Sequence, residues 1–247
     1  MKIDFFDFRE KFDNYGYFIC KNIFEKNFIF ELIGEIENSK DTIKYFDNSN
    51  NLRRIEKLYN KGNQLFNLNQ KILDLLKNVF NEDFLIFKDK FNAKPPGGKG
   101  FFAHYDGIFY FTDSNNKKKR GWYEYGDFFV NALVAIDKCN KENGALELAK
   151  FHKGTFDQLI SNTKKDGTPA LTKENEKKIS FDLINLDVGD VIIFSNTCPH
   201  RSKQNDSKQN RRVLYYTYTL AKNGSKYDMY FNDKAKSKNT SKALAEK

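Results

Sequence analysis

Upstream of Phe84, apolar residues recur every three or four positions, which is the spacing of one face of an α-helix. Residues 24–36 and 65–79 carry this pattern most clearly, and residues 5–12 suit a shorter helix. One run, residues 17–20, consists of aromatic, β-branched and cysteine residues and predicts a short strand instead. We therefore expect residues 1–83 to form a mainly helical flank.

From Phe84 onward the apolar runs become short, and turn-forming residues such as the Pro-Pro-Gly-Gly sequence at 95–98 separate them. Successive strands without intervening helices pack as an antiparallel barrel or jelly roll. We expect one mainly β domain over residues 1–221, with a β core at 84–221 and the early helices outside it. The predicted strands are residues 84–87, 128–136, 144–148, 191–194 and 212–220.

The composition is that of a globular protein with an excess of positive charge. Hydrophobic residues make up 39% of the chain and charged residues 30%, and the net charge is +9; the first two values exclude a mostly disordered chain. Much of the positive charge lies in the run 117–120 and in the Lys-rich residues 222–247, which we expect to be a flexible tail. Nucleic-acid binding stays an alternative function, because basic proteins often bind nucleic acid.

The sequence also bears on the cellular compartment. No apolar run reaches the roughly 18 residues of a membrane span, and we expect no cleavable signal after Met1. The three cysteines, Cys20, Cys139 and Cys198, are far apart, which favours reduced thiols over a disulfide framework. A soluble, cytoplasmic protein is expected.

The chain has only three histidines, so few metal sites are conceivable. His104-Tyr105-Asp106 places an imidazole and a carboxylate two residues apart, and on a strand such residues face the same way. His200 follows the predicted strand 191–194, where a barrel can bring it beside that pair. Two imidazoles and one carboxylate on one face leave coordination positions open, as in non-haem Fe(II) oxygenases.

Two side chains downstream of His200 suit a small diacid. Arg211 opens the predicted strand at 212–220, and Ser202 lies two residues after His200. An arginine fork holds a carboxylate through two parallel hydrogen bonds, and a serine hydroxyl adds a third donor. This pattern predicts a site for the distal carboxylate of a dicarboxylate co-substrate whose keto-acid end reaches the iron.

These residues occur within a longer resemblance. From about Phe8 to Leu220, the sequence resembles the phytanoyl-CoA dioxygenase family of Fe(II)- and 2-oxoglutarate-dependent oxygenases. The similar segments are residues 8–18, residues 143–147 with His152, residues 189–194, and residues 200–211. The resemblance implies a double-stranded β-helix, that is, a jelly roll or cupin-like barrel.

The resemblance also implies roles for single residues. His104, Asp106 and His200 would hold iron, Ser202 and Arg211 would hold 2-oxoglutarate, and Trp122 would line the co-substrate pocket. The family's Pro-Gly-Ser turn before the middle histidine is missing here, so we interpret His152 as structural. The carboxylate at Asp106 argues against halogenation, because halogenating relatives have a small residue at that position.

The implied reaction is hydroxylation of a small metabolite with O₂, with release of succinate and CO₂. The basic charge favours an anionic or zwitterionic substrate such as an organophosphonate. The loop 112–122 is the expected lid. Residues considered for substrate contact are Lys94 and Lys99 beside the turn at 95–98, Arg54, and the aromatic Tyr105.

Three alternatives stay open at this point. The same residues would serve demethylation or desaturation. A barrel that only binds a ligand would have neither iron affinity nor succinate release. A basic nucleic-acid-binding protein would depend on residues 117–120 and the Lys-rich tail, and its binding would weaken steeply with salt.

Overall fold

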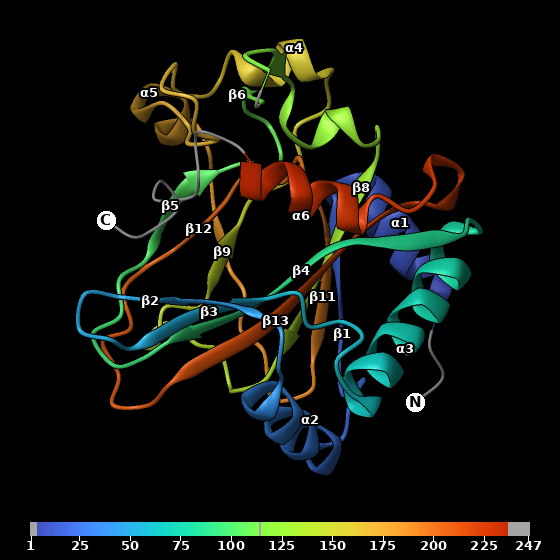
Figure 1. Ribbon diagram of the computed structural model, residues 1–247, viewed down its shortest axis with the longest axis vertical. Coiled ribbons are helices and arrows are strands. Elements are labelled where there is room, and N and C mark those ends of the chain that lie inside the picture. The colour runs from blue at the N-terminus through green and yellow to red at the C-terminus, as the bar shows by residue number, and fades with distance from the viewer. Residues whose placement is uncertain (1–3, 114, 237–247) are drawn as a thin grey trace.

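The computed structural model describes residues 4–113 and 115–236 (Figure 1). Three helices of more than ten residues precede most of the strands, and a fourth helix, of ten residues, follows them. The helices are α1 (Phe5–Tyr15), α2 (Lys26–Asn38), α3 (Asn63–Phe80), α4 (Phe156–Ile160), α5 (Lys173–Lys177) and α6 (Tyr227–Lys236), with 3₁₀ turns η1 (Gly121–Glu124) and η2 (Ala221–Asn223). No helix of the described residues is long and apolar enough to cross a membrane.

Two antiparallel sheets form the body of the molecule. The larger sheet has the order β1-β11-β8-β13-β4-β3-β2, and the smaller has the order β10-β9-β12-β5. The strands of the large sheet are β1 (Tyr17–Cys20), β2 (Ile43–Phe46), β3 (Leu52–Glu56), β4 (Phe84–Lys94), β8 (Phe129–Ala135), β11 (Val191–Ser195) and β13 (Arg211–Leu220). Those of the small sheet are β5 (Phe101–His104), β9 (Leu146–Leu148), β10 (Asp182–Leu183) and β12 (His200–Ser202). The two sheets face each other as a jelly roll, as expected from the sequence.

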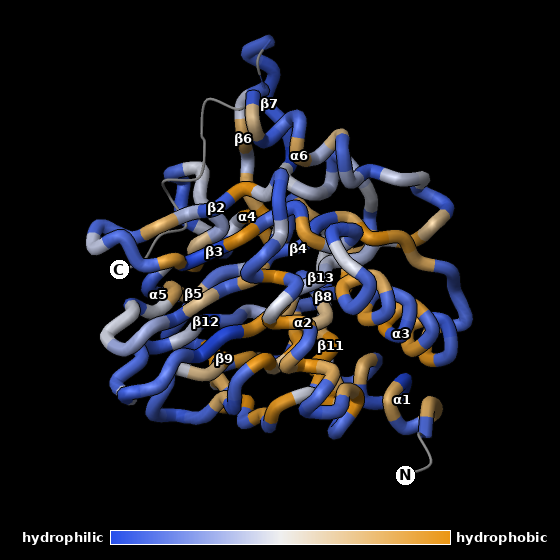
Figure 2. Tube along the Cα trace, turned by 60° about the horizontal axis from the view of Figure 1, so that its bottom comes forward, coloured by the Kyte–Doolittle hydropathy of each residue, from blue (hydrophilic) through white to orange (hydrophobic). Residues whose placement is uncertain are grey.

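Side chains of β8 alternate between the two faces of the large sheet, so that both faces are apolar. Val130, Ala132 and Val134 belong to the apolar cluster formed with the helices, whereas Leu133 and Ala135 pack toward the small sheet. Successive strand residues point to opposite faces, so one strand supplies both the helix-covered face and the face between the sheets. Apolar residues concentrate on β11 and on α3 (Figure 2).

The first helix has clear start and stop signals. The Asp4 side chain accepts hydrogen bonds from the backbone N–H groups of Phe6 and Asp7 at its beginning. Gly16 ends it with a φ of 83°, a conformation that glycine adopts without a steric penalty. A Cβ at Gly16 would lie 2.4 Å from the Cβ of Phe151. Both the positive φ and this close contact therefore require glycine here.

The N-terminal flank is less helical than the sequence predicts. Besides the expected β1, the segment contains β2 and β3, and β3 pairs with β4 through Arg54↔Asn92. Strands β1, β2 and β3 therefore extend the large sheet with residues that precede Phe84, between the three helices α1, α2 and α3. Strands β2 and β3 escaped notice because their residues are largely polar and partly exposed.

The Lys-rich segment also differs from the expectation. Residues 227–236 form α6, with Tyr227 and Phe231 buried, so this part is a docked helix rather than a flexible tail. Aromatic residues spaced four apart supply its apolar face. Residues 237–247, the rest of the predicted tail, lie outside the described residues.

The predicted lid is a hairpin followed by a turn. Strands β6 (Phe111–Thr112) and β7 (Lys118–Lys119) pair antiparallel and lead into η1. Two cations of the basic run are engaged, because Lys119 and Arg120 both lie within 4.0 Å of Glu124. That the hairpin acts as a lid remains a prediction.

Candidate metal centre

Three side chains meet on the inner face of the small sheet. His104 ends β5, His200 begins β12, and the two are direct cross-strand partners. Asp106 follows β5, with Oδ1 4.0 Å from Nε2 of His104 and Oδ2 3.7 Å from Nε2 of His200. One potential ligand atom from each residue lies within 4.8 Å of the other two. The sequence-predicted trio is thus brought together.

Hydrogen bonds orient both imidazoles toward the shared space. Nδ1 of His104 lies 2.8 Å from the carbonyl of Phe102, and Nδ1 of His200 lies 3.0 Å from the carbonyl of Cys198. A carbonyl can only accept, so each Nδ1 carries the proton and each Nε2 keeps its lone pair free for a metal. Burial lowers the pKa of His104 to about 3 and lowers that of His200 as well, which keeps both rings neutral.

Asp106 is held by a chain of polar residues. Asn131 donates from Nδ2 to Oδ2 of Asp106 at 3.0 Å, and Thr217 donates from Oγ1 to Oδ1 of Asn131 at 2.7 Å. Asn196 binds the backbone carbonyl of Asp106 at 3.0 Å. Burial by itself would raise the pKa of the Asp106 carboxyl, but the nearby Lys90 holds it below its usual range. The carboxylate is therefore ionised and fixed in direction.

This donor set fits a ferrous ion. Two neutral imidazole nitrogens and one carboxylate on a single face are the ligands of non-haem Fe(II) oxygenases, and they leave further positions open. The groups behind them, which fix ring and carboxylate orientation, are typical of metal ligands.

Arg211 supplies a cation with an unused donor. It opens β13, is only 4% exposed, and lines the same cavity as the trio. Nη2 binds the carbonyl of Gly144 at 3.2 Å, whereas Nε is buried with no hydrogen-bond partner among the described residues. Buried charged donors are rarely left unpaired, so this atom indicates a place for an anion.

Ser202 completes that place. Its Oγ accepts hydrogen bonds from Nζ of Lys94 at 2.9 Å and from the backbone N–H of Phe101 at 3.3 Å. Both lone pairs of the hydroxyl are then used, which leaves its proton to donate. Arg211 and Ser202 both line the cavity, and their joint role as a carboxylate site stays a prediction.

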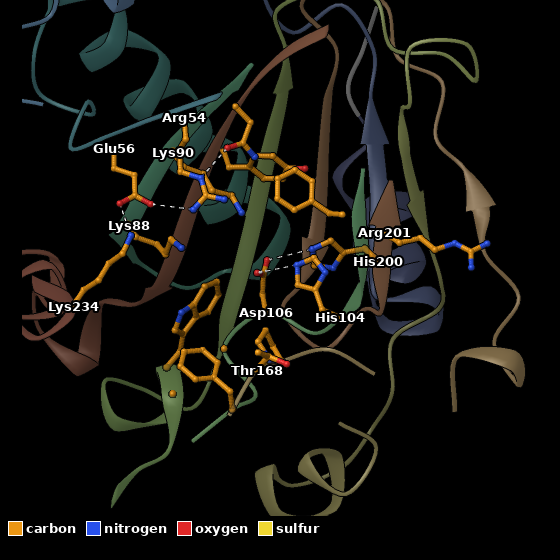
Figure 3. Close-up of a pocket in the computed structure, with 18 of the residues that line it drawn as sticks. Arg54, Glu56, Lys88, Lys90, His104, Asp106, Thr168, His200, Arg201 and Lys234 are labelled. Atoms are coloured by element: carbon orange, nitrogen blue, oxygen red, sulfur yellow. Dashed lines mark hydrogen bonds and ion pairs between the residues drawn. The ribbon is translucent and has the colours of Figure 1, made fainter. Parts of the chain in front are cut away.

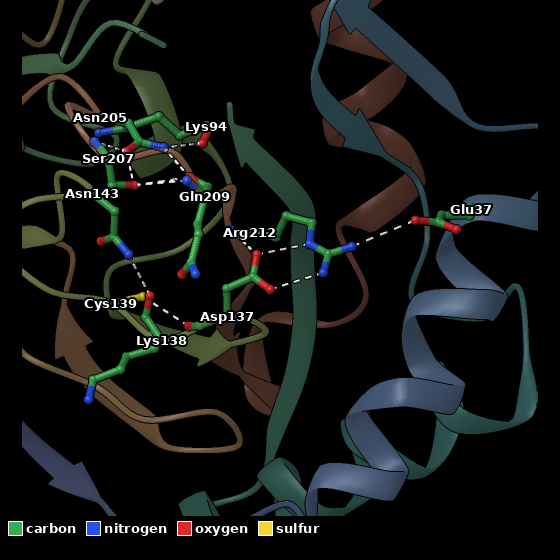
Figure 4. Close-up of polar contacts among 10 residues, drawn as sticks. All are labelled: Glu37, Lys94, Asp137, Lys138, Cys139, Asn143, Asn205, Ser207, Gln209 and Arg212. Carbon is green, nitrogen blue, oxygen red and sulfur yellow. Dashed lines mark hydrogen bonds and ion pairs between the residues drawn. The ribbon is translucent and has the colours of Figure 1, made fainter. Parts of the chain in front are cut away.

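The start of β13 is fixed from its outer side (Figure 4). Arg212 binds Asp137 through Nε and Nη2, each at 2.9 Å, and its Nη1 lies 3.7 Å from Glu37 on α2. Asn205, in the loop before the strand, donates to the carbonyls of Lys94 and Gln209. With Arg212 held outward, alternation along the strand directs Arg211 inward.

The trio opens into a cavity of about 640 Å³ with a strongly basic wall. This basic wall consists of four cationic side chains and one carboxylate: Arg54, Lys88, Lys90, Lys234 and Glu56. They gather on one side of the trio, whereas the Arg201 side chain points away from it (Figure 3). Arg201 instead pairs with Glu147 and Glu176.

The sequence-predicted substrate residues fare differently. Arg54 and the buried Trp122 line the cavity, with the indole ring packed on Phe87 and Phe129. Lys94 does not line it, because its ammonium group binds Ser202 and the carbonyls of Gly144 and Lys203.

Two further predictions about substrate residues require correction. Lys99 is exposed and lies outside the cavity lining. Tyr105, the residue after β5, is fully buried and does not line the cavity; its hydroxyl binds His152 and Asn162 instead. The same bond gives His152 the structural role expected from the sequence.

Sequence reasoning missed most of the basic wall. Lys88, Lys90 and Asn92 all line the cavity from β4, and their spacing of two residues was the available signal. Asn131, an amide within the apolar run of β8, was a second unused signal. Lys234 and Tyr230 went unnoticed because the segment that carries them resembles a flexible tail in its composition.

Comparison with known proteins agrees with this geometry. The family model of phytanoyl-CoA dioxygenase matches residues 12–213. The 2-aminoethylphosphonate dioxygenase of the uncultured bacterium HF130_AEPn_1 is 30% identical over 199 residues, covering 78% of this chain and 70% of that protein. Methylphosphonate hydroxylase of Gimesia maris is 28% identical over 68% of this chain, which spans 57% of that relative.

Solved structures show the same fold. EctD from S. alaskensis with bound Fe has a TM-score of 0.67 at 19% identity, covering 87% of this chain and 76% of that one. The epimerase SnoN in complex with Fe³⁺, alpha ketoglutarate and nogalamycin RO has a TM-score of 0.65 at 13% identity, covering 87% and 83%.

The family match covers most of the chain, and the donor set suits the metal that this family uses. On these grounds the chain belongs to the phytanoyl-CoA dioxygenase family of Fe(II)- and 2-oxoglutarate-dependent oxygenases.

Proposed function

We propose that this oxygenase hydroxylates a small organic anion, with a phosphonate as the leading substrate class, and releases succinate and CO₂. The observation that carries the proposal is the composition of the cavity. A metal-ligand trio and the unpaired Nε of Arg211 open into the same space as four cationic side chains and Glu56. The first group suits iron and 2-oxoglutarate, and the second suits an anionic substrate.

Each protein group has a definite task in this reaction. Bound iron, together with 2-oxoglutarate and O₂, supplies the oxidising power for attack on a C–H bond. His104, His200 and Asp106 would hold the metal, and Asn131 fixes the direction of the Asp106 carboxylate. The buried ring of Trp122 excludes water from one wall of the cavity.

Arg211 and Ser202 position the co-substrate. Among the described residues, the guanidinium Nε has no acceptor and the serine hydroxyl keeps its proton to donate, and both suit the distal carboxylate of 2-oxoglutarate. Charge-assisted hydrogen bonds of this kind are about twice as strong as neutral ones. They orient the diacid so that its keto-acid end reaches the metal ligands.

The substrate class rests on charge and on the relatives. The basic wall requires counter-charge, which a small acid provides. Two relatives carry names of phosphonate oxygenases, and a third, from Stutzerimonas stutzeri, is named as a probable alpha-ketoglutarate-dependent hypophosphite dioxygenase. Phosphorus oxyanions recur among these names, and we extend that class to this chain.

The test measures succinate with candidate substrates. Protein with Fe(II), 2-oxoglutarate and O₂ is given methylphosphonate, 2-aminoethylphosphonate, propionate, β-alanine or neutral ethanolamides, and succinate and hydroxylated product are quantified. We expect a phosphonate to stimulate succinate release with matching product, and the His200→Ala variant to release none. Stimulation by the neutral compounds alone would contradict the proposed substrate class.

A further inference from the structure

Lys88 is an ammonium group enclosed in the cavity without an acceptor. It is 8% exposed, and no hydrogen bond or ion pair to it occurs within the described residues. Its Nζ instead lies 4.9 Å from the ring centre of Trp122 and 5.4 Å from that of Tyr230. A buried cation is costly unless it is paired, so Lys88 lacks the anion that its surroundings call for.

Glu56 does not supply enough negative charge for its neighbours. It is 1% exposed and ion-pairs with Lys234 and, at 3.6 Å, with Nη1 of Arg54. Burial opposes its ionisation, but Lys234, Lys88 and Arg54 hold the pKa of its carboxyl below the usual range. Three cations around one carboxylate leave an excess of positive charge, and Lys90 adds a fourth cation to the same wall.

Helix α6 fixes the position of Lys234. Tyr230 and Lys234 are four residues apart and therefore lie on one face of the helix, and both line the cavity. The helix is held by bonds of 2.8 Å from Tyr227 to Asp89 and from Tyr125 to Asp233. This segment follows residue 213, where the match to the family model ends.

We propose that Lys88 of β4 and Lys234 of α6, arranged around Glu56, form the subsite for the anionic group of the substrate. The inference rests on the proposed function and deepens it. The ligand class is a tetrahedral oxyanion with two negative charges, a phosphonate or phosphate group, because a dianion offsets more of the excess positive charge of this wall than a monoanion does. The subsite lies across the cavity from His104, Asp106 and His200 (Figure 3), so a substrate held there extends its carbon chain toward the metal ligands.

The test measures binding to metal-free protein, so it does not depend on oxygenase activity. Methylphosphonate binding is followed by ³¹P NMR and calorimetry at a pH where the ligand is dianionic. Lys88→Met and Lys234→Met should each weaken binding by at least about tenfold, the scale of one lost charge-assisted hydrogen bond. Lys236→Met, an exposed lysine on the same helix, is the matched control and should change nothing.

Two further variants distinguish this subsite from an anion site at Arg211 and from cations that only neutralise Glu56. Arg211→Met should leave methylphosphonate affinity within about threefold; a loss there, with none in Lys88→Met, would place the anion at Arg211 and overturn the proposal. Glu56→Gln should tighten binding severalfold, because one competing negative charge is removed. Unchanged or weaker binding in a folded Glu56→Gln protein would mean that the cations serve only to neutralise Glu56.

The choice of ligands identifies the bound group. Methylphosphonate and inorganic phosphate should bind more tightly than propionate, which carries one negative charge; a preference for propionate would overturn the dianion assignment. Tight methylphosphonate binding without succinate formation would refute the proposed oxygenase reaction while leaving the subsite intact. Succinate formation with methylphosphonate binding unaffected by Lys88→Met would refute the subsite while leaving the proposed oxygenase reaction intact.

Discussion

At the scale of single residues, the metal centre depends on polar groups that never touch the metal. Asn131 binds Asp106 and is itself held by Thr217. Both come from strands of the large sheet, whereas the three candidate ligands come from the small sheet and the residues after it. The orientation of Asp106 is therefore set by the packing of the two sheets against each other.

We expect Asn131→Ala to weaken Fe(II) binding by about 10- to 100-fold, the usual cost of removing a group that orients a metal ligand. The carboxylate of Asp106 would rotate more freely once its Oδ2 loses this bond. Anaerobic competition with a chromophoric chelator measures the affinity, and Asn232→Ala, on the exposed face of α6, is the control. Equal affinity in the two variants would contradict the positioning role.

The buried Lys90 makes stability depend on pH. Burial lowers its pKa from 10.5 to about 7, so between these values the unfolded chain binds more protons than the folded one. Stability then rises with pH across that window, and the unfavourable contribution of Lys90 is largest at and below pH 7. This unfavourable contribution becomes smaller as the pH approaches 10.5, the pKa of the lysine in the unfolded chain.

Lys90→Met should accordingly raise the free energy of unfolding by about 1 kcal/mol or more near pH 7 and by less near pH 10. Urea unfolding at the two pH values measures the difference. Lys44→Met, at an exposed position of β2, gives the baseline. An increase that is the same at both pH values would show that the gain comes from packing alone.

At the scale of elements, α6 is both a structural and a functional segment. Phe231 is buried between rings of Tyr227 and Tyr230, and it helps to dock the helix that carries Lys234. We expect Phe231→Ala to lower the free energy of unfolding by about 3 kcal/mol, in the range of large aromatic truncations. The same substitution should weaken methylphosphonate binding, because it loosens the helix that carries Lys234.

Unfolding by urea and the ³¹P titration measure the two effects in the same protein. Met229→Ala serves as the control, because Met229 is 47% exposed on the same helix. A destabilised Phe231→Ala protein that still binds methylphosphonate normally would show that Lys234 does not need the docked helix.

The helices and strands with the clearest apolar patterns in the sequence were the ones that could be predicted. The long apolar stripes predicted α2 and α3, and the β-rich runs predicted β8, β11 and β13, each within a few residues. Strand β4 was expected to end near Phe87 but continues to Lys94, because lysines on its inner face hide the alternation. Helix α6 was missed since its lysines and aspartates outweigh its few aromatic residues.

At the scale of the whole molecule, the space between the sheets is divided into two parts. One part is an apolar core that includes Leu133, Leu148 and Phe194, and it needs no ligand. The other is the cavity with the metal ligands and the basic wall. The apolar part holds the sheets in register, so the polar part can carry several unpaired charges.

His104 and Asp106 could be predicted from sequence because the pair is local, and His200 could be added because the chain has only three histidines. The basic wall could not, since it combines β3, β4 and α6, which come together through the pairing of β3 with β4 and the docking of α6 on β4. Lys94 illustrates the opposite error: it lies near the site in sequence, but its ammonium group is engaged in internal hydrogen bonds.

The central claim is that His104, Asp106 and His200 hold one ferrous ion while Arg211 holds the distal end of 2-oxoglutarate. Its most direct test is an anaerobic titration of 2-oxoglutarate into protein with Fe(II), following the weak visible band of an iron-chelated keto acid. We predict the band in the unaltered protein, its absence in His200→Ala and Asp106→Ala, and at least about tenfold more 2-oxoglutarate needed by Arg211→Met. No band in the unaltered protein, or the same 2-oxoglutarate dependence in Arg211→Met, would contradict the account.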